Sequence, residues 1–520
     1  MRSPRRKARL ADNGPQACKP SLPLQIDIES PSMPAADTTH LIRLTQDALD
    51  DQNDFSTHHL RLGLKKNQSS GQDDIESTAS SVQSHRVRRD TDQLPTDNAL
   101  LVRLIPDDSI KAMEPLLRQD TNILDVRYPP NQAPSLSSST SSLANLLAAE
   151  LERIFLEERE IVEYVLAQAQ SSGLSASGNP KDSKPKGLKS LDADSIARSA
   201  SRSSRSFRYA SNLHITFSLF TPYASPSGWE IEAALKNEFA PLLDSLSAVS
   251  NFSIDTQVQL YAKFAPSTPK PEFDDEAGTW TLKKDDLSSF INAAEWPLSP
   301  SVGIGPTLNF IVYVPDVANT PLVVKEGHST HWLVPQWGGV AILNDFNSSS
   351  SQSILTKEQI QPALYIFAHQ LLSLMGAPAS PPSLPIQLQT LIRIQAVSLM
   401  LSASSTMRSL ARLTVKLPSI AIPETVSLAV RNTLVDLRET CTALKEGDFR
   451  KALAHAKTAE EEAEKGFFEK SMVGQVYFPD EHKVAVYLPL LGPIGVPLLM
   501  SGVKELKRLL AARRAIRAPA

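Results

Sequence analysis

Residues 484–503 (VAVYLPLLGPIGVPLLMSGV) form a run of twenty residues without a charge, the feature that most limits how this chain can fold. At a rise of about 1.5 Å per residue, such a helix is about 30 Å long, the thickness of a bilayer's hydrocarbon core. Polar residues 480–483 precede the run, and a basic tail with Glu505 as its only acid follows it. Because basic residues stay on the cytoplasmic side, we predict a transmembrane helix with a cytosolic tail. A buried helix of a soluble core is the alternative.

Three prolines leave one face of this helix with unpaired backbone carbonyls. Pro489, Pro493 and Pro497 recur at every fourth position, so they share a face. Each removes a backbone hydrogen bond, and a carbonyl left unpaired in hydrocarbon is costly. Gly492 lies near the same edge and lets another backbone approach closely. We therefore expect the face formed by Pro489, Gly492, Pro493 and Pro497 to contact partner helices.

Composition excludes several classes of protein. The chain carries 53 Lys and Arg against 57 Asp and Glu, a net charge of −4, which excludes a generally basic nucleic-acid binder. Its two cysteines, Cys18 and Cys441, are too few for a disulfide scaffold, a Cys-rich zinc module or an iron–sulfur protein. They can form one bridge at most, and we expect Cys441 to pack in a helix.

The N-terminal residues complicate the topology. Residues 1–34 are basic and polar, without an apolar run long enough for a signal peptide or signal anchor. A cytosolic C-terminal tail requires an upstream segment that sends the bulk of the chain across the membrane. We expect either that this start lacks or replaces such a segment, or that the protein is tail-anchored with a cytosolic bulk.

Composition also divides the chain into regions. Short apolar clusters near residues 22–26 and 60–62 suggest strands within an otherwise polar stretch. Residues 171–206 hold twelve serines, which predicts a disordered surface insertion. The predicted regions are a polar, partly disordered N-terminal region (1–95), an α/β domain (96–475), the membrane helix (484–503) and a basic cytosolic tail (504–520).

Hydrophobic periodicity predicts the elements of the domain. From residue 143 to about 170, apolar residues at three- and four-residue steps indicate a helix, with Glu152, Glu157 and Glu160 outside. Residues 213–219 alternate between apolar and polar, which predicts a half-buried strand, whereas the continuously apolar residues 308–314 predict a central strand.

The remaining pattern predicts further strands and a helical end. A strand at 213–219, a helix near 229–242 and a strand near 252–264 suggest a crossover unit on a sheet. Thr356 and Gln359 form a capping box, and Gly376 closes the helix that follows. Further strands are expected at 100–105, 123–126, 332–334 and 340–343, and the helical part at 356–472.

Recognisable catalytic motifs are missing from the sequence. It contains no P-loop, G-x-S-x-G, dinucleotide or H-E-x-x-H pattern. His328 and His331 are a weak candidate pair for a metal or a hydrolytic site, in what reads as a loop. Three N-x-S/T sites, at Asn67, Asn251 and Asn347, are possible N-glycosylation sites.

Three segments in order resemble one family. The closing stretch 476–499 resembles the C-terminal membrane segment of the PIG-S family, a subunit of the GPI-anchor transamidase. Residues 331–344 (HWLVPQWGGVAILN) are similar to that family's P-x-W-G-G strand motif, and residues 214–220 followed by Trp229 are similar to its first strong strand. The resemblance covers about residues 205–510.

The resemblance implies both a fold and a role. It implies an α/β (mixed α+β) lumenal domain with a central sheet and C-terminal helices, followed by one C-terminal transmembrane helix. In the family pattern, a second membrane helix precedes that domain. The implied role is a non-catalytic subunit, without cofactor or metal, that supports attachment of GPI anchors to precursor proteins at the endoplasmic reticulum membrane.

The implied partners are PIG-K, PIG-T, PIG-U, a GAA1-type subunit and the membrane, with no nucleic acid. The resemblance also implies a structural role for the P-x-W-G-G motif, in which a turn forms and two backbone segments approach closely. The residues of this role are Pro335, Trp337, Gly338 and Gly339, and packing in the core is the alternative for Trp337. The alternative functions are a tail-anchored adaptor of the endoplasmic reticulum and a membrane-tethered hydrolase.

Overall fold

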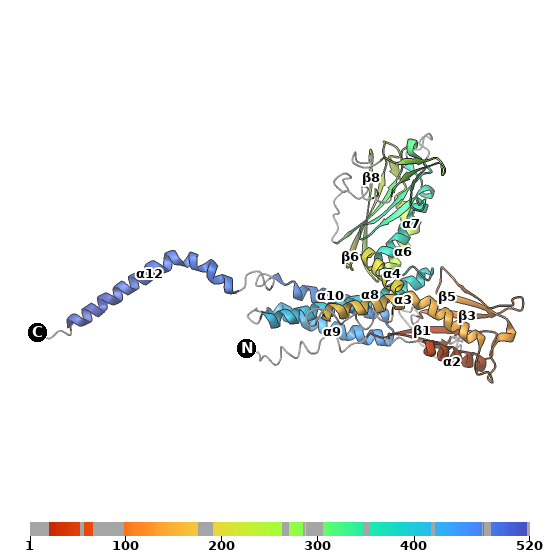
Figure 1. The fold of residues 1–520 in the computed structure, drawn as a ribbon, viewed down its shortest axis with the longest axis horizontal. Coiled ribbons are helices and arrows are strands. Elements are labelled where there is room, and N and C mark those ends of the chain that lie inside the picture. Colours follow the sequence, from red (N-terminus) through yellow and green to blue (C-terminus); the bar gives the residue numbers. More distant parts are fainter. Residues whose placement is uncertain are drawn as a thin grey trace, which may run out of the picture. The chain divides into compact units, whose positions relative to one another are not determined.

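The fold is a mixed α/β structure with C-terminal helices, as predicted (Figure 1). A computed structural model describes residues 20–52, 57–65, 98–174, 191–262, 270–283, 287, 305–346, 354–417, 422–470, 472 and 480–516. The chain forms two compact units, which are described separately. Residues 16–402 and 436–458 make the first unit, and residues 1–15, 403–435 and 459–520 make the second.

The first sheet of the first unit is mostly parallel and has the order β2-β1-β3-β5-β4. Helix α2 (Ala35–Gln52) connects the parallel strands β1 and β2, and β4 alone pairs antiparallel. One face carries the apolar core, including Leu24, Ile26 and Val102, all fully buried. The strands are β1 (Leu22–Glu29), β2 (His58–Leu64), β3 (Leu100–Pro106), β4 (Glu114–Leu117) and β5 (Ile123–Tyr128).

This sheet corrects the predicted region 1–95. Strand β1, helix α2 and strand β2 lie in that region and belong to the folded sheet. The two apolar clusters predicted as strands are confirmed, since they are β1 and β2. Strand β1 buries one face only, so its apolar residues alternate with Gln25, Asp27 and Glu29. Residues 1–19, 53–56 and 66–97 lie outside the described part.

The second sheet has the order β13-β14-β11-β6-β8. The predicted crossover is confirmed, because β6 and β8 are parallel and the helical residues 231–246 connect them. The predicted central strand is confirmed as β11, which lies between β14 and β6 and is almost wholly buried. The strands are β6 (Asn212–Phe220), β8 (Asn251–Gln259), β11 (Thr307–Tyr313), β13 (His331–Val334) and β14 (Gly338–Ile342).

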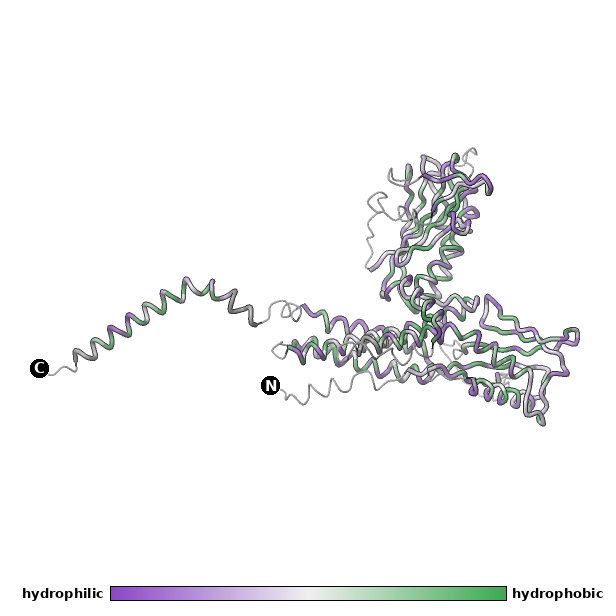
Figure 2. Tube along the Cα trace, in the orientation of Figure 1, coloured by the Kyte–Doolittle hydropathy of each residue, from purple (hydrophilic) through white to green (hydrophobic). Residues whose placement is uncertain are grey.

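Strand β6 is buried on both faces, and the prediction of a half-buried strand is therefore wrong. Its apolar row packs with Phe239, Phe310 and Phe367, with Phe217 and Phe310 stacked 5.6 Å apart. Its polar row, His214, Thr216 and Ser218, is also buried. On the same face as that row, Phe220 joins Ile311, Tyr313 and Val340 in a second apolar cluster. Figure 2 shows the hydrophobic residues along these strands.

Two small sheets complete the strands of the first unit. The three-stranded sheet has the order β12-β10-β9 and supplies Leu282 and Leu322 to the second apolar cluster. The two-stranded sheet pairs β15 with β7. Their strands are β7 (Gly228–Trp229), β9 (Glu272–Asp274), β10 (Thr279–Leu282), β12 (Leu322–Val324) and β15 (Ile354–Leu355).

The serine-rich segment is partly helical, which corrects the predicted insertion 171–206. Helix α3 (Ser142–Leu174) is confirmed and runs past residue 170, and helix α4 (Ala193–Arg205) follows. Asp192 caps α4 by accepting the backbone N–H of Ser195 at 3.1 Å. Ser195 and Ser199 are buried on its inner face, so small polar residues here permit close helix packing. Residues 175–190 lie outside the described part.

The predicted helical part is also confirmed. The capping box is present at the start of α7 (Lys357–Met375), and Gly376 ends the helix with a left-handed φ of 84°. Three long helices follow: α8 (Leu384–Lys416), α9 (Glu424–Glu446) and α10 (Phe449–Phe467). The last described helix is α12 (Asp480–Ile516).

Candidate functional site

Helix α12 contains the predicted membrane segment 484–503. Among the described residues, two helices are long and apolar enough to cross a bilayer. The apolar window of α8 is 56% buried, as in a core helix, whereas that of α12 (487–511) is 0% buried. Large apolar side chains point outward all around α12, for example Leu488 and Leu499. A helix that is apolar on every side requires lipid or partner helices around it.

The three prolines lie inside this helix, which continues through them. Figure 1 shows that α12 is bent, and prolines are a common cause of helix bending. A Cβ at Gly492 would have no neighbour within 4 Å. The face formed by Pro489, Gly492, Pro493 and Pro497 is therefore open along the described part of this chain, and its contact with partner helices stays a prediction.

The predicted P-x-W-G-G motif forms the turn of a hairpin between β13 and β14. Pro335 and Gln336 are exposed at the turn, and Gln336 has a left-handed φ of 58°. The backbone N–H of Gln336 donates to Arg205 O at 3.1 Å, which joins the turn to the end of α4. Trp337 is half-buried against the second apolar cluster, in agreement with the core-packing alternative.

The two glycines of the motif lie against neighbouring elements. A Cβ at Gly338, whose φ is 151°, would be 1.8 Å from the backbone oxygen of Asn309 on β11. A Cβ at Gly339 would be 1.8 Å from Gln370 Oε1 on α7. Gln370 Nε2 donates to Trp332 O at 3.0 Å. Gly338 leaves room for no Cβ because the hairpin lies directly on the backbone of β11, whereas a Cβ at Gly339 would displace the end of the Gln370 side chain.

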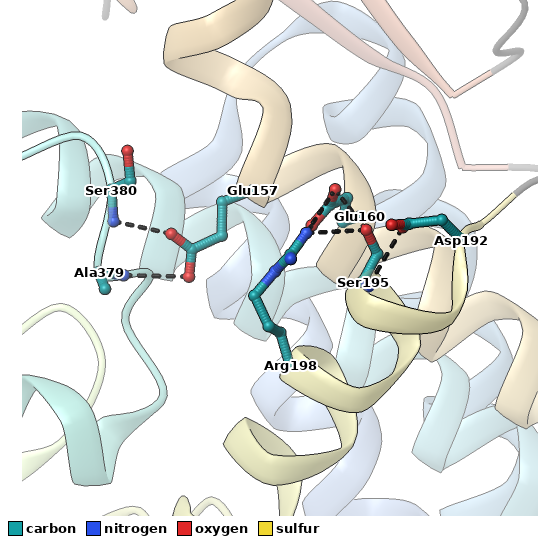
Figure 3. A network of polar contacts seen from close by, with 7 residues as sticks. All are labelled: Glu157, Glu160, Asp192, Ser195, Arg198, Ala379 and Ser380. Carbon is teal, nitrogen blue, oxygen red and sulfur yellow. Dashed lines mark hydrogen bonds and ion pairs between the residues drawn. The ribbon is translucent and has the colours of Figure 1, made fainter.

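A polar network joins α3 to the connection between α7 and α8 (Figure 3). Glu157 accepts the backbone N–H groups of Ala379 at 3.1 Å and Ser380 at 2.7 Å. Burial lowers the pKa of Arg202 on α4 to about 10, and the charge of Glu157 partly opposes that shift. Glu157 therefore connects the helix beside the first sheet to the helices beside the second.

The same network joins α3 to α4. Glu160 accepts a hydrogen bond from Ser195 Oγ at 2.7 Å and pairs with Arg198 at 3.1 Å. Glu160 is only 9% exposed, so its predicted place on the outer face of the helix is wrong. The periodicity of α3 missed it because α4 covers this stretch, and only the serine-rich pattern of α4 could have indicated so close a contact.

A buried ion cluster fixes the other side of α3. Arg393 of α8 donates two hydrogen bonds of 2.7 Å to the carboxylate of Glu158, and Thr390 donates a third at 2.8 Å. His58 Nε2 of β2 lies 3.4 Å from the same carboxylate. Burial alone would raise the pKa of Glu158, but the charge and hydrogen bonds of Arg393 hold it well below its usual value. The cluster connects the first sheet, α3 and α8.

The structure brings together one Ser–His–Asp contact that the sequence did not reveal. His214 Nδ1 lies 2.8 Å from Ser253 Oγ, and its Nε2 lies 3.0 Å from Asp255 Oδ2. Ser253 and Asp255 alternate on the edge strand β8, opposite β6. Next to them Gln257 donates to Ser218 Oγ at 2.8 Å, so the contact is part of a cross-strand polar ladder.

The other candidate residues are dispersed. His328 lies in a turn with a left-handed φ of 50°, and His331 begins β13. Within the described ranges, no three His, Cys, Asp or Glu residues cluster as metal ligands. Cys441 packs in α9, as predicted, and is also disulfide-bonded. The chain's other cysteine, Cys18, lies outside the described residues.

Of the three possible glycosylation sites, one lies in the described structure. Asn251 is exposed at the first position of β8, where a glycan can extend into solvent. Asn67 and Asn347 lie outside the described residues.

Comparison with known proteins agrees with the resemblance of the three segments. The profile of phosphatidylinositol-glycan biosynthesis class S protein (PIG-S) matches residues 8–512. A rat protein named GPI-anchor transamidase component PIGS is 31% identical over 314 residues, 56% of each chain. The fission yeast GPI transamidase component PIG-S homolog is 30% identical over 333 residues, 62% of this chain and 58% of its own.

The budding yeast protein GPI transamidase component GPI17 is 29% identical over 327 residues, 58% of each chain. The alignments with these curated relatives span a little over half of the length of each. The family profile, in contrast, covers nearly all of this chain, from the N-terminal residues to α12. The chain therefore belongs to the PIG-S family of phosphatidylinositol-glycan biosynthesis proteins.

Proposed function

We propose that this protein is a membrane-anchored, non-catalytic subunit of a GPI transamidase, which supports attachment of GPI anchors to precursor proteins. The observation that carries the proposal is the match of the family profile to residues 8–512 in a chain whose helix α12 has an apolar window of which no part is buried. The names of the curated relatives describe them as components of that complex. In this role the two sheets are a docking body, and α12 anchors it.

The proposed topology places the body in the lumen of the endoplasmic reticulum and the tail in the cytosol. Lys504, Lys507 and Arg508 follow the apolar part of α12, as expected on the cytoplasmic side. The disulfide at Cys441 supports the lumenal placement, because disulfides persist in oxidising compartments. The exposed Asn251 is available to the lumenal glycosylation machinery.

Topology is tested in intact microsomes. The body is expected to be protected from added protease, whereas an epitope tag placed after residue 520 is digested. Treatment with endoglycosidase should shift the mobility of the protein, and Asn251→Gln should reduce that shift. A protected tag with an exposed body would overturn the proposed orientation and favour the tail-anchored adaptor.

Membership in the complex is tested by co-purification in digitonin. We expect PIG-K, PIG-T, PIG-U and the GAA1-type subunit to be recovered with the full chain. The face formed by Pro489, Gly492, Pro493 and Pro497 is the proposed contact within the membrane. Replacing Pro493 and Pro497 with Leu should reduce recovery of PIG-U, the proposed neighbour in the membrane. Recovery of the tagged chain without PIG-K would contradict the proposal.

One observation favours a second candidate, the membrane-tethered hydrolase. The Ser253–His214–Asp255 contact has the residue types of a serine hydrolase triad. Asp255 is 60% exposed, so its charge is screened by water and orients the imidazole weakly. A fluorophosphonate probe separates the two functions, because a reactive Ser253 would be labelled and Ser253→Ala would remove the label. We expect no labelling at Ser253.

A further inference from the structure

Three helix ends come together in the second unit. The C-terminal end of α8, the start of α9 and the end of α10 share a small apolar cluster that contains Leu410, Val426 and Met472. Asn432 Nδ2 donates to Glu462 Oε2 at 3.1 Å, and a Cβ at Gly466 would be 3.3 Å from that of Ala429. These contacts make α9 and α10 antiparallel, so the end of α10 lies beside the start of α9.

Large apolar side chains around this cluster face solvent. Val415 is 59% exposed at the end of α8, and Ile422, just before α9, is 43% exposed. Leu428 in the second turn of α9 is 52% exposed, and Phe468 after α10 is 63% exposed. We call these four residues the bundle tip. Such a group of exposed apolar residues is typical of a surface that binds lipid or protein.

Charged side chains of both signs surround the bundle tip. The exposed cations within one helical turn of its apolar residues are Arg412, Lys416, Arg431, Lys465 and Lys470, and the anions are Glu424 and the half-exposed Glu464 and Glu469. The excess of cations is compatible with a layer of lipid headgroups around the apolar side chains.

The chain itself brings the bundle tip close to α12. Phe468 and Asp480, the first residue of α12, are separated by twelve residue steps in the same unit. At most about 3.5 Å per residue, these steps span about 42 Å when fully extended. The apolar window of α12 begins at Tyr487, less than two helical turns further on. A tether of this length allows the bundle end to reach the surface of the bilayer that holds α12.

We propose that the bundle tip inserts into the interfacial layer of the bilayer that holds α12. This inference rests on the proposed membrane anchoring by α12. Phe468 and Ile422 would enter the boundary between headgroups and acyl chains, where apolar side chains leave water while the nearby lysines stay hydrated. The second unit then has a second attachment to the membrane besides α12.

Photo-crosslinking in lipid nanodiscs tests the proposal on the full chain. The photoreactive residue p-benzoylphenylalanine replaces Ile422 or Phe468, and lipid adducts are measured by mass spectrometry in phosphatidylcholine nanodiscs. Val435 is the matched control, because it is apolar, 51% exposed and on α9. At about 1.5 Å per residue it lies about 16 Å along α9 from Glu424, the first residue of the helix, which Ile422 precedes by two residues. All three positions are exposed, so the probe replaces no core side chain.

We expect at least fivefold more lipid adduct at Ile422 and Phe468 than at Val435. Equal labelling at the three positions overturns the proposal, as does crosslinking of Ile422 and Phe468 to a protein instead of lipid in native membranes. Resistance to carbonate extraction is measured on the same variants in native membranes. Release of the chain by carbonate refutes the anchoring by α12 and this inference with it, whereas a carbonate-resistant chain with equal labelling refutes the bundle-tip contact alone.

Discussion

The two five-stranded sheets share a parallel core and one antiparallel edge strand, yet they are buried differently. The first sheet buries one face, so β1 and β3 alternate between buried and partly exposed residues. The second sheet buries both faces of its three inner strands, so β6, β11 and β14 are buried at nearly every position. One-sided burial leaves room for ion pairs on the open face, whereas two-sided burial requires an apolar or fully hydrogen-bonded residue at every position.

The two sheets therefore depend on different interactions. Four phenylalanine rings pack against one another on one face of the second sheet, and two of them are stacked 4.9 Å apart, those of Phe310 and Phe367. The other two are Phe217 and Phe239. The first sheet contacts a buried ion pair through His58 of β2, which lies 3.4 Å from Glu158. Glu158 pairs with Arg393, and both are only 2–3% exposed. Substitutions in these two groups test the comparison most directly.

The largest effect is expected from Phe310→Ala, which leaves a cavity beneath the two-sided sheet. The expected cost is about 3–5 kcal/mol in the free energy of unfolding, measured by urea titration of the detergent-solubilised chain. The matched control is Leu101→Ala on the partly exposed face of β3, where the cost should be much smaller. Equal costs would show that the two sheets do not differ in burial as described.

Arg393→Met is expected to lower the free energy of unfolding by about 3 kcal/mol, because it leaves the charge of Glu158 buried without its Arg partner. The control is the double substitution of Glu158 and Arg393 by Met, which removes both charges and should recover most of the lost stability. A double variant as unstable as Arg393→Met would show that packing, not charge, causes the loss.

The pairing of Glu158 with Arg393 also predicts that the free energy of unfolding depends on pH. The pKa of Glu158 is lower in the folded chain than in the unfolded chain, so its contribution to stability is present above an unfolded pKa of about 4.3. That contribution is lost as the pH falls below this value towards the folded pKa. Urea titrations at a series of pH values from 3 to 7 should therefore show a steeper acid loss in the wild type than in the double Met variant.

A smaller effect is expected at the hairpin of the second sheet. Gly338→Ala should cost about 2–3 kcal/mol, because its Cβ would overlap a backbone oxygen of β11 that cannot move aside. Gly339→Ala should cost about 1–2 kcal/mol, since it displaces only the end of the Gln370 side chain. Urea titration of both variants checks the order, and the reverse order would contradict the described contact with β11.

These residues also show how far the sequence can predict the structure. Periodicity alone located the strands β6 and β11, the crossover to β8 and helices α7 to α10. It could not show that the polar row His214, Thr216 and Ser218 is buried, because alternation looks the same whether or not a second layer covers the polar face. The Ser253–His214–Asp255 contact and the Glu158–Arg393 pair join residues far apart in the chain, which no local pattern indicates.

The smallest effect on stability is expected in the serine-rich segment, where α4 contacts α3 between the two sheets. Ser195→Ala removes the hydroxyl that donates to the buried Glu160 and should cost about 1 kcal/mol in the free energy of unfolding. Arg198 pairs with the same carboxylate but is 62% exposed, so Arg198→Ala should change stability less than Ser195→Ala does. If Arg198→Ala costs more, the contact between α4 and α3 is held by the surface charge. If neither variant changes stability, α4 contributes no stabilising contact through Glu160, and the disordered insertion predicted for residues 171–206 describes this segment better than the helix does.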